Sequence, residues 1–570
     1  MTRPVPAIVI LGNGSLATAR RIQQVYPGAL VHGLADRVQD ADRLYHEFGA
    51  TLRAMYQQDT PIIALCAAGI VIRTLAPLLL EKGAEPPVLA VAEDGSAVVP
   101  LLGGLGGVNV MAREIAAALE VAAAITTSGE LRFGTCLLNP PSGYALGDLE
   151  LGKRFVSDLL AGETVRVEGQ APWLAQAQLP EHPDARLAVH VGHAEREPSA
   201  NELLIYPRNV LVAVRAITAS PDAIRDALRG AKIAVQSIAC LLAGDSEMAT
   251  PALHEAALEL GVPLRFAPGV GALCDLARHA VGLPVVIHGD ENIAIAVAEQ
   301  PLAVSVIGRA RGRLAVIGLG PGAAELMVPA VKTELARAND VLGYETYVRM
   351  AGPFRADQVL HCTDNREEMQ RARHAFELAA QGRSVVVVSS GDPGVFAMAA
   401  AVLEALHEST DDAWHNVDLE ILPGVSASLA TAAQAGAPLG HDFCVLSLSD
   451  NLKPWAIIEK RLDLAAQADL ALAFYNPISR SRPWQLGQAL GIVAKHRTPQ
   501  TPVVLGRDIG RPGQTLRVTT LGELTPDQVD MRTMVLIGSS TTRVIARADG
   551  RLWVYTPRSY GDKLLPITTR

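Results

Sequence analysis

Two glycine loops in the sequence have the spacing of a dinucleotide-binding fingerprint. Gly318-Leu-Gly-Pro-Gly-Ala323 and Gly12-Asn-Gly-Ser-Leu-Ala17 each read G-x-G-x-x-A after an apolar run. Such a loop offers backbone N–H groups to a pyrophosphate. In the loop at 318–323, Pro321 removes one of these donors. The acidic residue that binds the ribose should follow the second strand of such a unit, but Asp340 stands before the strand that comes next. Asp36 is better placed for the earlier loop, but a plain strand–helix turn is the favoured interpretation there.

Small and polar residues follow two further apolar strands in the last part of the chain. Ser384–Ser389 runs into Ser390-Gly-Asp-Pro-Gly394, and a second strand runs into Pro423-Gly-Val-Ser-Ala427. Glycine lets the main chain approach a ligand closely. Asp392 can pair with an ammonium group, or it can cap a helix beginning near residue 395. Ser426 has the same capping alternative, so these residues alone leave both roles open.

The elements around these loops alternate between strands and helices, which predicts an α/β fold. A chain of 570 residues is long enough for several domains. We expect α/β domains at 1–125 and 206–300, an irregular segment rich in proline and polar residues at 126–205, and a basic linker at 301–312. A fresh strand then opens the last part of the chain. The interesting residues fall where a strand ends and a helix begins, and open α/β sheets bind ligands at that edge.

Composition excludes several classes of function. Hydrophobic residues make up 49% of the chain and charged residues 19%, which is typical of buried globular layers. No apolar run approaches the roughly 20 residues of a membrane helix, and the start lacks the features of a leader, so we expect a cytoplasmic protein. The net charge of −9 argues against nucleic-acid binding. The six cysteines are dispersed without a C-x-x-C pair, so we expect no metal site.

The ordered motifs of the last part resemble one family. They are Gly318–Gly322, Gly343–Tyr347, Ser389–Phe396, Leu422–Ala427, Leu446–Asp450, Phe474–Pro477 and Leu536–Ser540. Together they resemble the tetrapyrrole methyltransferase family over nearly all of residues 313–545. The runs at 446–461 and 475–482 are similar to its ring-contracting branch, which methylates precorrin-3B at C-17 and forms precorrin-4 in cobalamin biosynthesis.

This resemblance implies two α/β lobes, at 313–423 and 424–570, with S-adenosyl-L-methionine between them. Pro321 should form the floor of the active site, and Asp392 should pair with the ammonium group of the cofactor. The residues that the resemblance assigns to cofactor binding are Gly320, Pro321, Ser390, Gly391, Asp392, Val395, Ser426, Ala427 and Asn476. The chemistry implied is transfer of a sulfonium methyl to a nucleophilic ring carbon, in which the protein mainly aligns the reactants and excludes water.

Ring contraction also requires removal of a proton from a hydroxyl and an acid for the displaced oxygen. The candidates beside the motifs are Tyr344, Tyr347, Asp364, Asp450 and Asp508, and we select Tyr344, Tyr347 and Asp508 as catalytic candidates. A substrate with several carboxylates should be surrounded by cations. Arg371 and Arg511 also lie beside the motifs, but the predicted substrate-binding residues are Arg366, Lys453, Arg480, Arg482 and Arg507.

The front half resembles the cobalt-precorrin-5A hydrolase family more weakly. The similarity rests on Cys66–Pro77, Leu101–Asn109, Arg113-Glu-Ile and Thr126-Thr. A histidine expected before the Gly-Gly-x-Asn pattern is absent, and Val212-Ala-Val-Arg-Ala216 replaces a Gly-Cys-Arg-Arg strand end. The apolar packing pattern is kept although these chemical groups are lost. We therefore expect the front half to keep the hydrolase fold without its hydrolytic activity, and to bind a corrinoid or dock a neighbouring cobalamin-pathway enzyme.

Alternative functions are a methyltransferase of the same fold acting at another corrin carbon or on another substrate, a bifunctional methyltransferase–hydrolase acting on cobalt-precorrin intermediates, and a non-catalytic corrinoid carrier. The motifs at 446–450 and 475–480 favour the ring-contracting reaction over the first alternative. The family resemblance also implies a homodimer. Whether the substrate contains cobalt stays open at this point.

Overall fold

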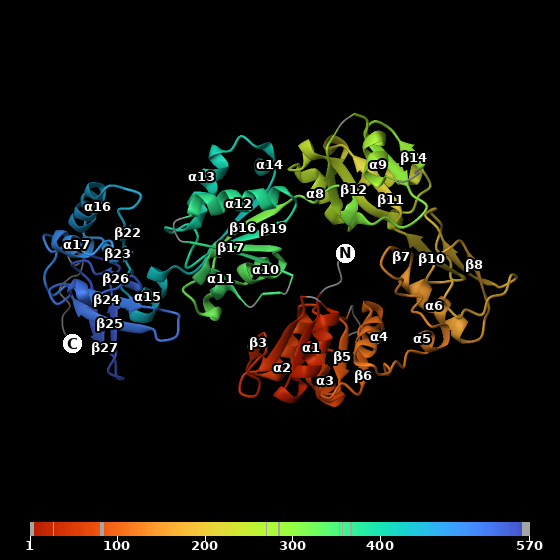
Figure 1. Cartoon of the computed structure of the whole chain (residues 1–570), viewed down its shortest axis with the longest axis horizontal. Helices are drawn as coiled ribbons and strands as arrows, with labels where there is room; N and C mark the ends of the chain where they lie inside the picture. Colours follow the sequence, from red (N-terminus) through yellow and green to blue (C-terminus); the bar gives the residue numbers. More distant parts are fainter. Residues whose placement is uncertain are drawn as a thin grey trace. The chain divides into compact units, whose positions relative to one another are not determined.

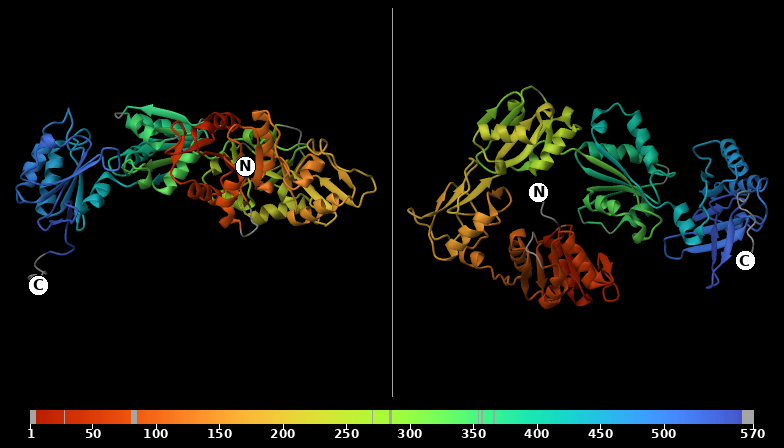
Figure 2. Two further views of the ribbon diagram at one scale, coloured as in Figure 1. Left: turned by 90° about the horizontal axis from the view of Figure 1, so that it is seen from below. Right: turned by 180° about the vertical axis from the view of Figure 1, so that it is seen from behind.

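The structure, a computed structural model, describes residues 5–26, 28–79, 85–269, 271–282, 286–352, 354–355, 357–364 and 367–560. It divides into two compact units, Met1–Gly312 with Pro353–Gln358, and Arg313–Gly352 with Val359–Arg570. Each unit contains several layered sheets, which Figures 1 and 2 show from three sides. Among the described residues, no helix combines the length and the apolar character needed to cross a membrane.

The first sheet of the front unit is doubly wound. Its order is β3-β2-β1-β4-β5-β6, and all neighbours are parallel except β5 and β6. Helices α1 and α4 pack on Ile8 and Ile10 of one face, and α2 and α3 pack on Val9 of the other. The strands and helices are β1 Ala7–Ile10, β2 Leu30–Leu34, β3 Arg43–Tyr45, β4 Ile62–Leu65, β5 Val88–Val91, β6 Val98–Leu102, α1 Leu16–Val25, α2 Phe48–Gln57, α3 Ala68–Leu75 and α4 Val108–Leu119.

A second sheet occupies the segment that the sequence predicted to be irregular, and that interpretation was wrong. Its order is β7-β10-β9-β8, and the buried side chains of Phe133 and Phe155 fill the core beneath one face. Long polar connections separate strands of only a few residues, so the sequence shows no sustained period. The elements are α5 Ser128–Phe133, β7 Tyr144–Leu146, α6 Leu149–Leu160, β8 Val165–Glu168, β9 Leu187–Val191 and β10 Glu202–Pro207.

The third sheet of the front unit has the order β13-β12-β11-β15-β14. Helices α7 and α8 pack on one face and α9 on the other, as the two separate core clusters show. The elements are β11 Val210–Val214, α7 Pro221–Gly230, β12 Ile238–Gly244, α8 Pro251–Leu260, β13 Leu264–Ala267, α9 Leu273–Val281, β14 Val286–Gly289 and β15 Ile293–Val297.

The first lobe of the second unit is a parallel sheet with the order β18-β17-β19-β16-β20. Figure 1 shows α12 and α13 on one face of this sheet and α10 and α11 on the other. Because the strands are parallel, the loops after β16, β19 and β20 meet at one edge. The elements are β16 Arg313–Gly318, α10 Pro329–Arg337, β17 Asp340–Tyr344, α11 Glu345–Ala351, β18 Val359–Thr363, α12 Glu368–Ala380, β19 Ser384–Ser389, α13 Met398–Glu408, α14 Asp412–His415 and β20 Asp418–Leu422.

The second lobe is a mixed sheet with the order β22-β23-β26-β24-β25, in which only β22 and β23 are parallel. Its largest core cluster lies between this sheet and helices α16 and α17. The same lobe contains a small three-stranded sheet with the order β21-β28-β27. The elements are α15 Ala427–Ala435, β21 Gly436–Ala437, β22 Phe443–Ser447, α16 Trp455–Gln467, β23 Ala471–Tyr475, α17 Gln485–Val493, β24 Pro502–Arg507, β25 Thr515–Thr520, β26 Thr533–Ile537, β27 Arg543–Ala546 and β28 Leu552–Tyr555.

Candidate functional site

Three glycines bring the ends of β16, β19 and β20 into direct backbone contact. A Cβ atom at Gly318 would lie 2.4 Å from the Gly391 carbonyl oxygen, and one at Gly424 would lie 2.2 Å from the same oxygen. Real Cβ atoms do not approach a carbonyl this closely, so each position requires glycine. We call these residues the glycine cradle (Gly318, Gly391 and Gly424). It leaves main chain, not side chain, at this edge of the sheet.

Gly320 and Gly391 pair their loops by two backbone hydrogen bonds. The Gly391 N–H donates to the Gly320 carbonyl at 2.8 Å, and the Gly320 N–H donates to the Gly391 carbonyl at 3.1 Å. Both residues have positive φ, at +73° and +70°. Pro321, which is buried, follows directly. The pairing therefore fixes Pro321 and Ser390 beside each other at the carboxyl edge of the sheet.

Asp392 holds two loops through its two carboxylate oxygens. Oδ1 accepts from the Gly394 N–H at 2.8 Å, and Oδ2 accepts from the Gly424 N–H at 3.1 Å. The next helix, α13, begins only at Met398 with Ala397 at its N-cap, so Asp392 does not cap it. Carboxylate oxygens have lone pairs beyond those used here, and they can accept from an ammonium group. The half-buried Val395 lies in the same loop.

Ser426 caps α15 at the start of the second lobe. Its Oγ accepts from the Leu429 N–H at 3.4 Å, and Ala427 is the first residue of the helix. Ser428 joins this helix to β23, because its N–H donates to the Tyr475 hydroxyl oxygen at 3.2 Å. Asn476 follows that strand with φ of +49°, and its amide donates to Ser447 Oγ. These contacts place the predicted residues of the second lobe on adjoining elements.

Phe396 is a residue of this site that the sequence reasoning missed. It has φ of +53°, it is 52% exposed, and its ring lies 5.4 Å from the ring of Tyr475. Asn476 and Asp508, which directly follow β23 and β24, also have positive φ. Strained backbone of this kind gathers at functional sites. Nothing in local periodicity identifies Phe396, because its conformation depends on the loop packed around it.

The two candidate tyrosines lie together at the start of α11. Their rings are edge to face with centroids 5.4 Å apart. Burial raises the pKa of Tyr347, while the positive charge of Arg511 partly opposes that shift. The Tyr347 phenol therefore holds its proton at neutral pH, and it can donate a hydrogen bond or a proton.

The third catalytic candidate, Asp508, is 6% exposed and lies at the end of β24. Arg532 approaches its carboxylate at 2.6 Å and Arg507 at 3.2 Å. Arg507 also pairs with Asp530 at 2.8 Å. Arg507, a predicted substrate-binding residue, is therefore paired with carboxylates of the protein itself. The cluster connects the end of β24 to the loop before β26.

A family model described as Tetrapyrrole (Corrin/Porphyrin) Methylases matches residues 313–525. A precorrin-3B C(17)-methyltransferase of Sinorhizobium sp is 49% identical over 249 residues, which cover 44% of this chain and 97% of that protein. The chain belongs to the tetrapyrrole methylase family. This membership makes the chain a methyltransferase, and it confirms the predicted family and α/β fold class.

Two further relatives are similar to this tetrapyrrole methylase. The cobalamin biosynthesis protein CobIJ of Mycobacterium tuberculosis is 47% identical over 255 residues. The match covers 44% of this chain and about half (49%) of that relative. A crystal structure of the methyltransferase CobJ is 51% identical over 43% of this chain and 100% of that one, with a TM-score of 0.41. In the front half, residues 50–130 match a model described as Cobalamin synthesis G N-terminal, which confirms the predicted resemblance for that stretch.

The predicted substrate-binding cations of this methylase differ in their surroundings. Arg366 lies outside the described residues. Arg480 is exposed, whereas Arg482 is 7% exposed and donates to the Asn476 carbonyl at 3.1 Å. Lys453 lies over the Phe396 ring at 5.9 Å, and burial lowers its pKa. Lys453 and Arg480 are therefore the described members of the predicted set that no carboxylate or carbonyl engages.

Motif residues of the front half form a polar network around the buried side chains of Asn109 and Glu130. Asn109 donates to Glu130 Oε1 at 2.6 Å and to the Thr127 hydroxyl at 3.0 Å. Arg113 pairs with the other Glu130 oxygen at 2.6 Å. Glu130 is 4% exposed, so both of its partners are needed to offset the burial of its charge. This network joins α4 of the first sheet to α5 of the second.

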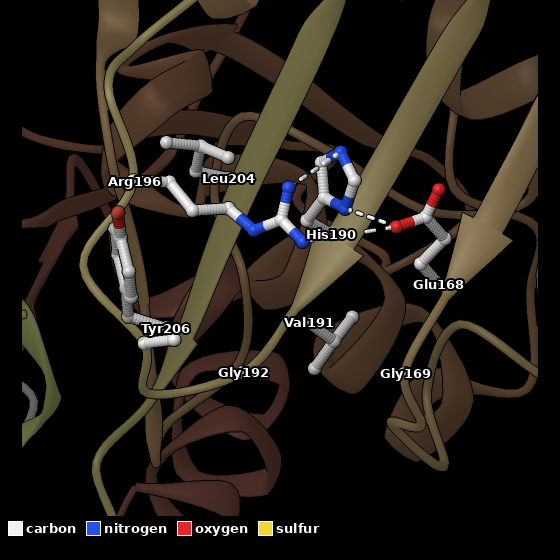
Figure 3. A pocket seen from close by; sticks show the side chains of 9 residues that line it. Glu168, Gly169, His190, Val191, Gly192, Arg196, Leu204 and Tyr206 are labelled. Atoms are coloured by element: carbon white, nitrogen blue, oxygen red, sulfur yellow. Dashed lines mark hydrogen bonds and ion pairs between the residues drawn. The ribbon is translucent and has the colours of Figure 1, made fainter. Parts of the chain in front are cut away.

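The front half also contains a cavity of about 160 Å³ on the second sheet (Figure 3). The buried His190 lies between two carboxylates, with Nδ1 2.7 Å from Glu168 and Nε2 3.1 Å from Glu202. Arg196 approaches the imidazole at 3.5 Å and the Glu168 carboxylate at 3.9 Å. Gly169 is required beside them, because a Cβ there would lie 2.1 Å from the Val191 carbonyl oxygen. Among the described residues, no group of three metal-ligating side chains is placed to hold an ion.

Proposed function

We propose that this chain uses S-adenosyl-L-methionine to methylate precorrin-3B at C-17 and to contract its ring, forming precorrin-4. The observation that carries the proposal is the glycine cradle with Pro321 and Asp392 at the edge of a parallel sheet. The precorrin-3B C(17)-methyltransferase of Sinorhizobium sp, which is matched over 97% of its length, supports the methylation at C-17. The activity of the whole chain, including its front half, is part of the same proposal.

In this proposal the cofactor lies at the edge formed by the loops after β16, β19 and β20. Gly320 and the glycine cradle provide close main-chain contact, and Pro321 provides the floor. Asp392 and Ser390 bind the methionine end, with Val395, Ser426, Ala427 and Asn476 completing the pocket. When bound, the cofactor supplies an electrophilic methyl group. The residues present suit it, because Asp392 retains acceptor capacity for an ammonium group.

Tyr347 supplies the acid of the ring contraction in this proposal. A tyrosine phenol is protonated at neutral pH, and burial raises the pKa of Tyr347 further, so the group is a hydrogen-bond donor for the displaced oxygen. Tyr344, at 5.4 Å between ring centroids, holds its ring edge to face. Asp508 acts less directly, because its carboxylate already meets Arg532 and Arg507. We assign Asp508 to positioning of the loop after β24.

Cations of this unit bind the carboxylates of the substrate in this proposal. Lys453, held over the Phe396 ring, and the exposed Arg480 are the described residues that we assign this role. Arg366 is also proposed, because it lies beside the motifs in the sequence. Arg482 and Arg507 contribute by holding the Asn476 carbonyl and the end of β24 instead.

The proposal includes a cytoplasmic location and a homodimer formed through the methyltransferase region. A dimer should elute and scatter light at twice the mass of the 60.2 kDa chain. Contact with neighbouring cobalamin-pathway enzymes would add to that mass only when those proteins are present. Light scattering of the purified chain, alone and mixed with such enzymes, separates these states.

For the front half, we propose binding of a corrinoid intermediate without hydrolysis. A second candidate function is hydrolysis of a lactone, which the cavity around His190 favours, since a buried imidazole between two carboxylates can move a proton. Incubation of the chain with a purified lactone intermediate distinguishes them. Binding without acetaldehyde release supports the first function, whereas release that His190→Gln abolishes supports the second.

Methyl transfer from labelled S-adenosyl-L-methionine tests the main proposal. Purified chain is incubated with metal-free precorrin-3B or with its cobalt-containing counterpart, and the label in the tetrapyrrole is counted. Transfer to the metal-free compound is expected. Transfer only to the cobalt compound would move the enzyme to the cobalt-dependent route, and transfer to neither would refute the substrate assignment.

A further inference from the structure

Arg511 of the second lobe reaches the cofactor loops of the first lobe. It follows β24 in a turn closed by its own N–H, which donates to the Asp508 carbonyl at 2.9 Å. Its Nε donates to the Pro321 carbonyl at 2.9 Å, and its Nη2 donates to the Ser390 hydroxyl at 3.1 Å. One guanidinium group therefore holds both loops that the proposed function assigns to the cofactor.

The backbone beside Arg511 is shaped for this contact. A Cβ at Gly510 would lie 2.9 Å from Pro321 Cγ, and a Cβ at Gly322 would lie 2.6 Å from Arg511 Cγ. Both glycines also have positive φ, +80° and +137°. The two turns can approach only because neither carries a side chain at these positions. The contact is thus built into both lobes.

Part of the guanidinium group is left for another partner. Within the described part of the chain, Nη1 of Arg511 has no hydrogen-bond or ion-pair partner, and the side chain is half-buried. Its charge acts on the nearby Tyr347 phenol. A planar guanidinium group with unpaired N–H donors binds carboxylates well. The ion pair between the two groups is stronger where water is partly excluded.

We propose that Arg511 is a positioning residue that locks the Pro321 and Ser390 loops into their cofactor-binding form and anchors a carboxylate of the tetrapyrrole through Nη1. This inference rests on the proposed function and extends it to the coupling of the two ligands. A substrate carboxylate that binds Nη1 orients the guanidinium, and the same group orients the loops that hold the methyl donor. Loss of Arg511 should therefore weaken both ligands.

The test compares Arg511→Gln and Arg511→Lys with the full-length wild type. Calorimetry gives the Kd of S-adenosylhomocysteine without any tetrapyrrole, and turnover gives kcat and KM for precorrin-3B. We expect Arg511→Gln to raise both the Kd and the KM about tenfold or more. Arg511→Lys should recover part of the KM by its charge, but not the Kd, because an ammonium group lacks the fork that reaches two loops.

Arg517→Gln is the matched control, since Arg517 is exposed on the neighbouring strand β25 and should leave both constants unchanged. Unchanged Kd and KM in Arg511→Gln would overturn the inference, and a raised KM with unchanged Kd would overturn the positioning role. A wild type that binds S-adenosylhomocysteine but methylates no precorrin-3B would refute the proposed substrate. In that case the Kd values still decide whether Arg511 holds the loops.

Discussion

The Asp392 carboxylate shows how much a single residue contributes beyond its place in a motif. From the sequence it was either a cofactor ligand or a helix cap, and local spacing could not separate the two roles. The structure places α13 farther along the chain and gives Asp392 two backbone donors, from Gly394 and Gly424. The second of these is a long-range contact, which no local pattern can predict.

Asp392→Asn should weaken cofactor binding. The amide can still accept through one atom, but its NH₂ group faces either the Gly394 or the Gly424 N–H, and the negative charge is lost. We expect the Kd of S-adenosylhomocysteine to rise about tenfold, which corresponds to about 1.4 kcal/mol. Calorimetry measures this, with the exposed Asp527→Asn as control. An unchanged Kd would remove Asp392 from the cofactor site.

Tyr347→Phe should lower kcat about a hundredfold and leave the Kd of S-adenosylhomocysteine unchanged, because only the proton donor is lost. Burial raises the pKa of Tyr347, so its phenol stays protonated as the pH rises from 7 to 9. The wild-type kcat should therefore show no Tyr347-dependent change in that range. A kcat that climbs with pH, and climbs only when Tyr347 is present, would instead identify a tyrosinate base.

At the scale of elements, the sequence predicted the strand–glycine–helix units well where each strand is a continuous apolar run. The runs at 314–318 and 384–389 are strands β16 and β19, and their loops meet at one edge as expected for a parallel sheet. The segment 126–205 was misjudged, because its strands are short and lie far apart in the chain. Pairing between distant short strands is set by the tertiary fold.

The network around Glu130 connects two elements, and its loss should be felt at both. Glu130→Ala removes the carboxylate partner of Arg113, whose side chain is 42% exposed, and leaves Asn109 with Thr127 alone, so we expect a loss of about 1–2 kcal/mol in local stability. Hydrogen exchange of peptides from α4 and α5 measures the free energy of opening. The exposed Glu150→Ala on α6 should change it by less than about 0.5 kcal/mol. Equal effects of the two substitutions would show that the network is not stabilising.

At the scale of the whole molecule, the chain combines a methyltransferase unit with a front unit of three sheets. The sequence indicated the methyltransferase clearly, because many ordered motifs lie in one stretch. Fewer of the polar contacts in the front unit could be predicted from the sequence. There the polar side chains interact with partners on other strands, as His190 does with Glu168 and Glu202. Such a cluster becomes visible only when the strands are aligned.

The most direct test of the central claim is the position of the transferred methyl group. Full-length chain is incubated with precorrin-3B and S-adenosyl-L-methionine labelled with carbon-13 in its methyl group, and the product is analysed by mass and carbon NMR. We predict one label at C-17 of a contracted ring that carries an acetyl group. A label at another ring carbon, or methylation without contraction, would contradict the account and assign the chain to a different reaction of the same family.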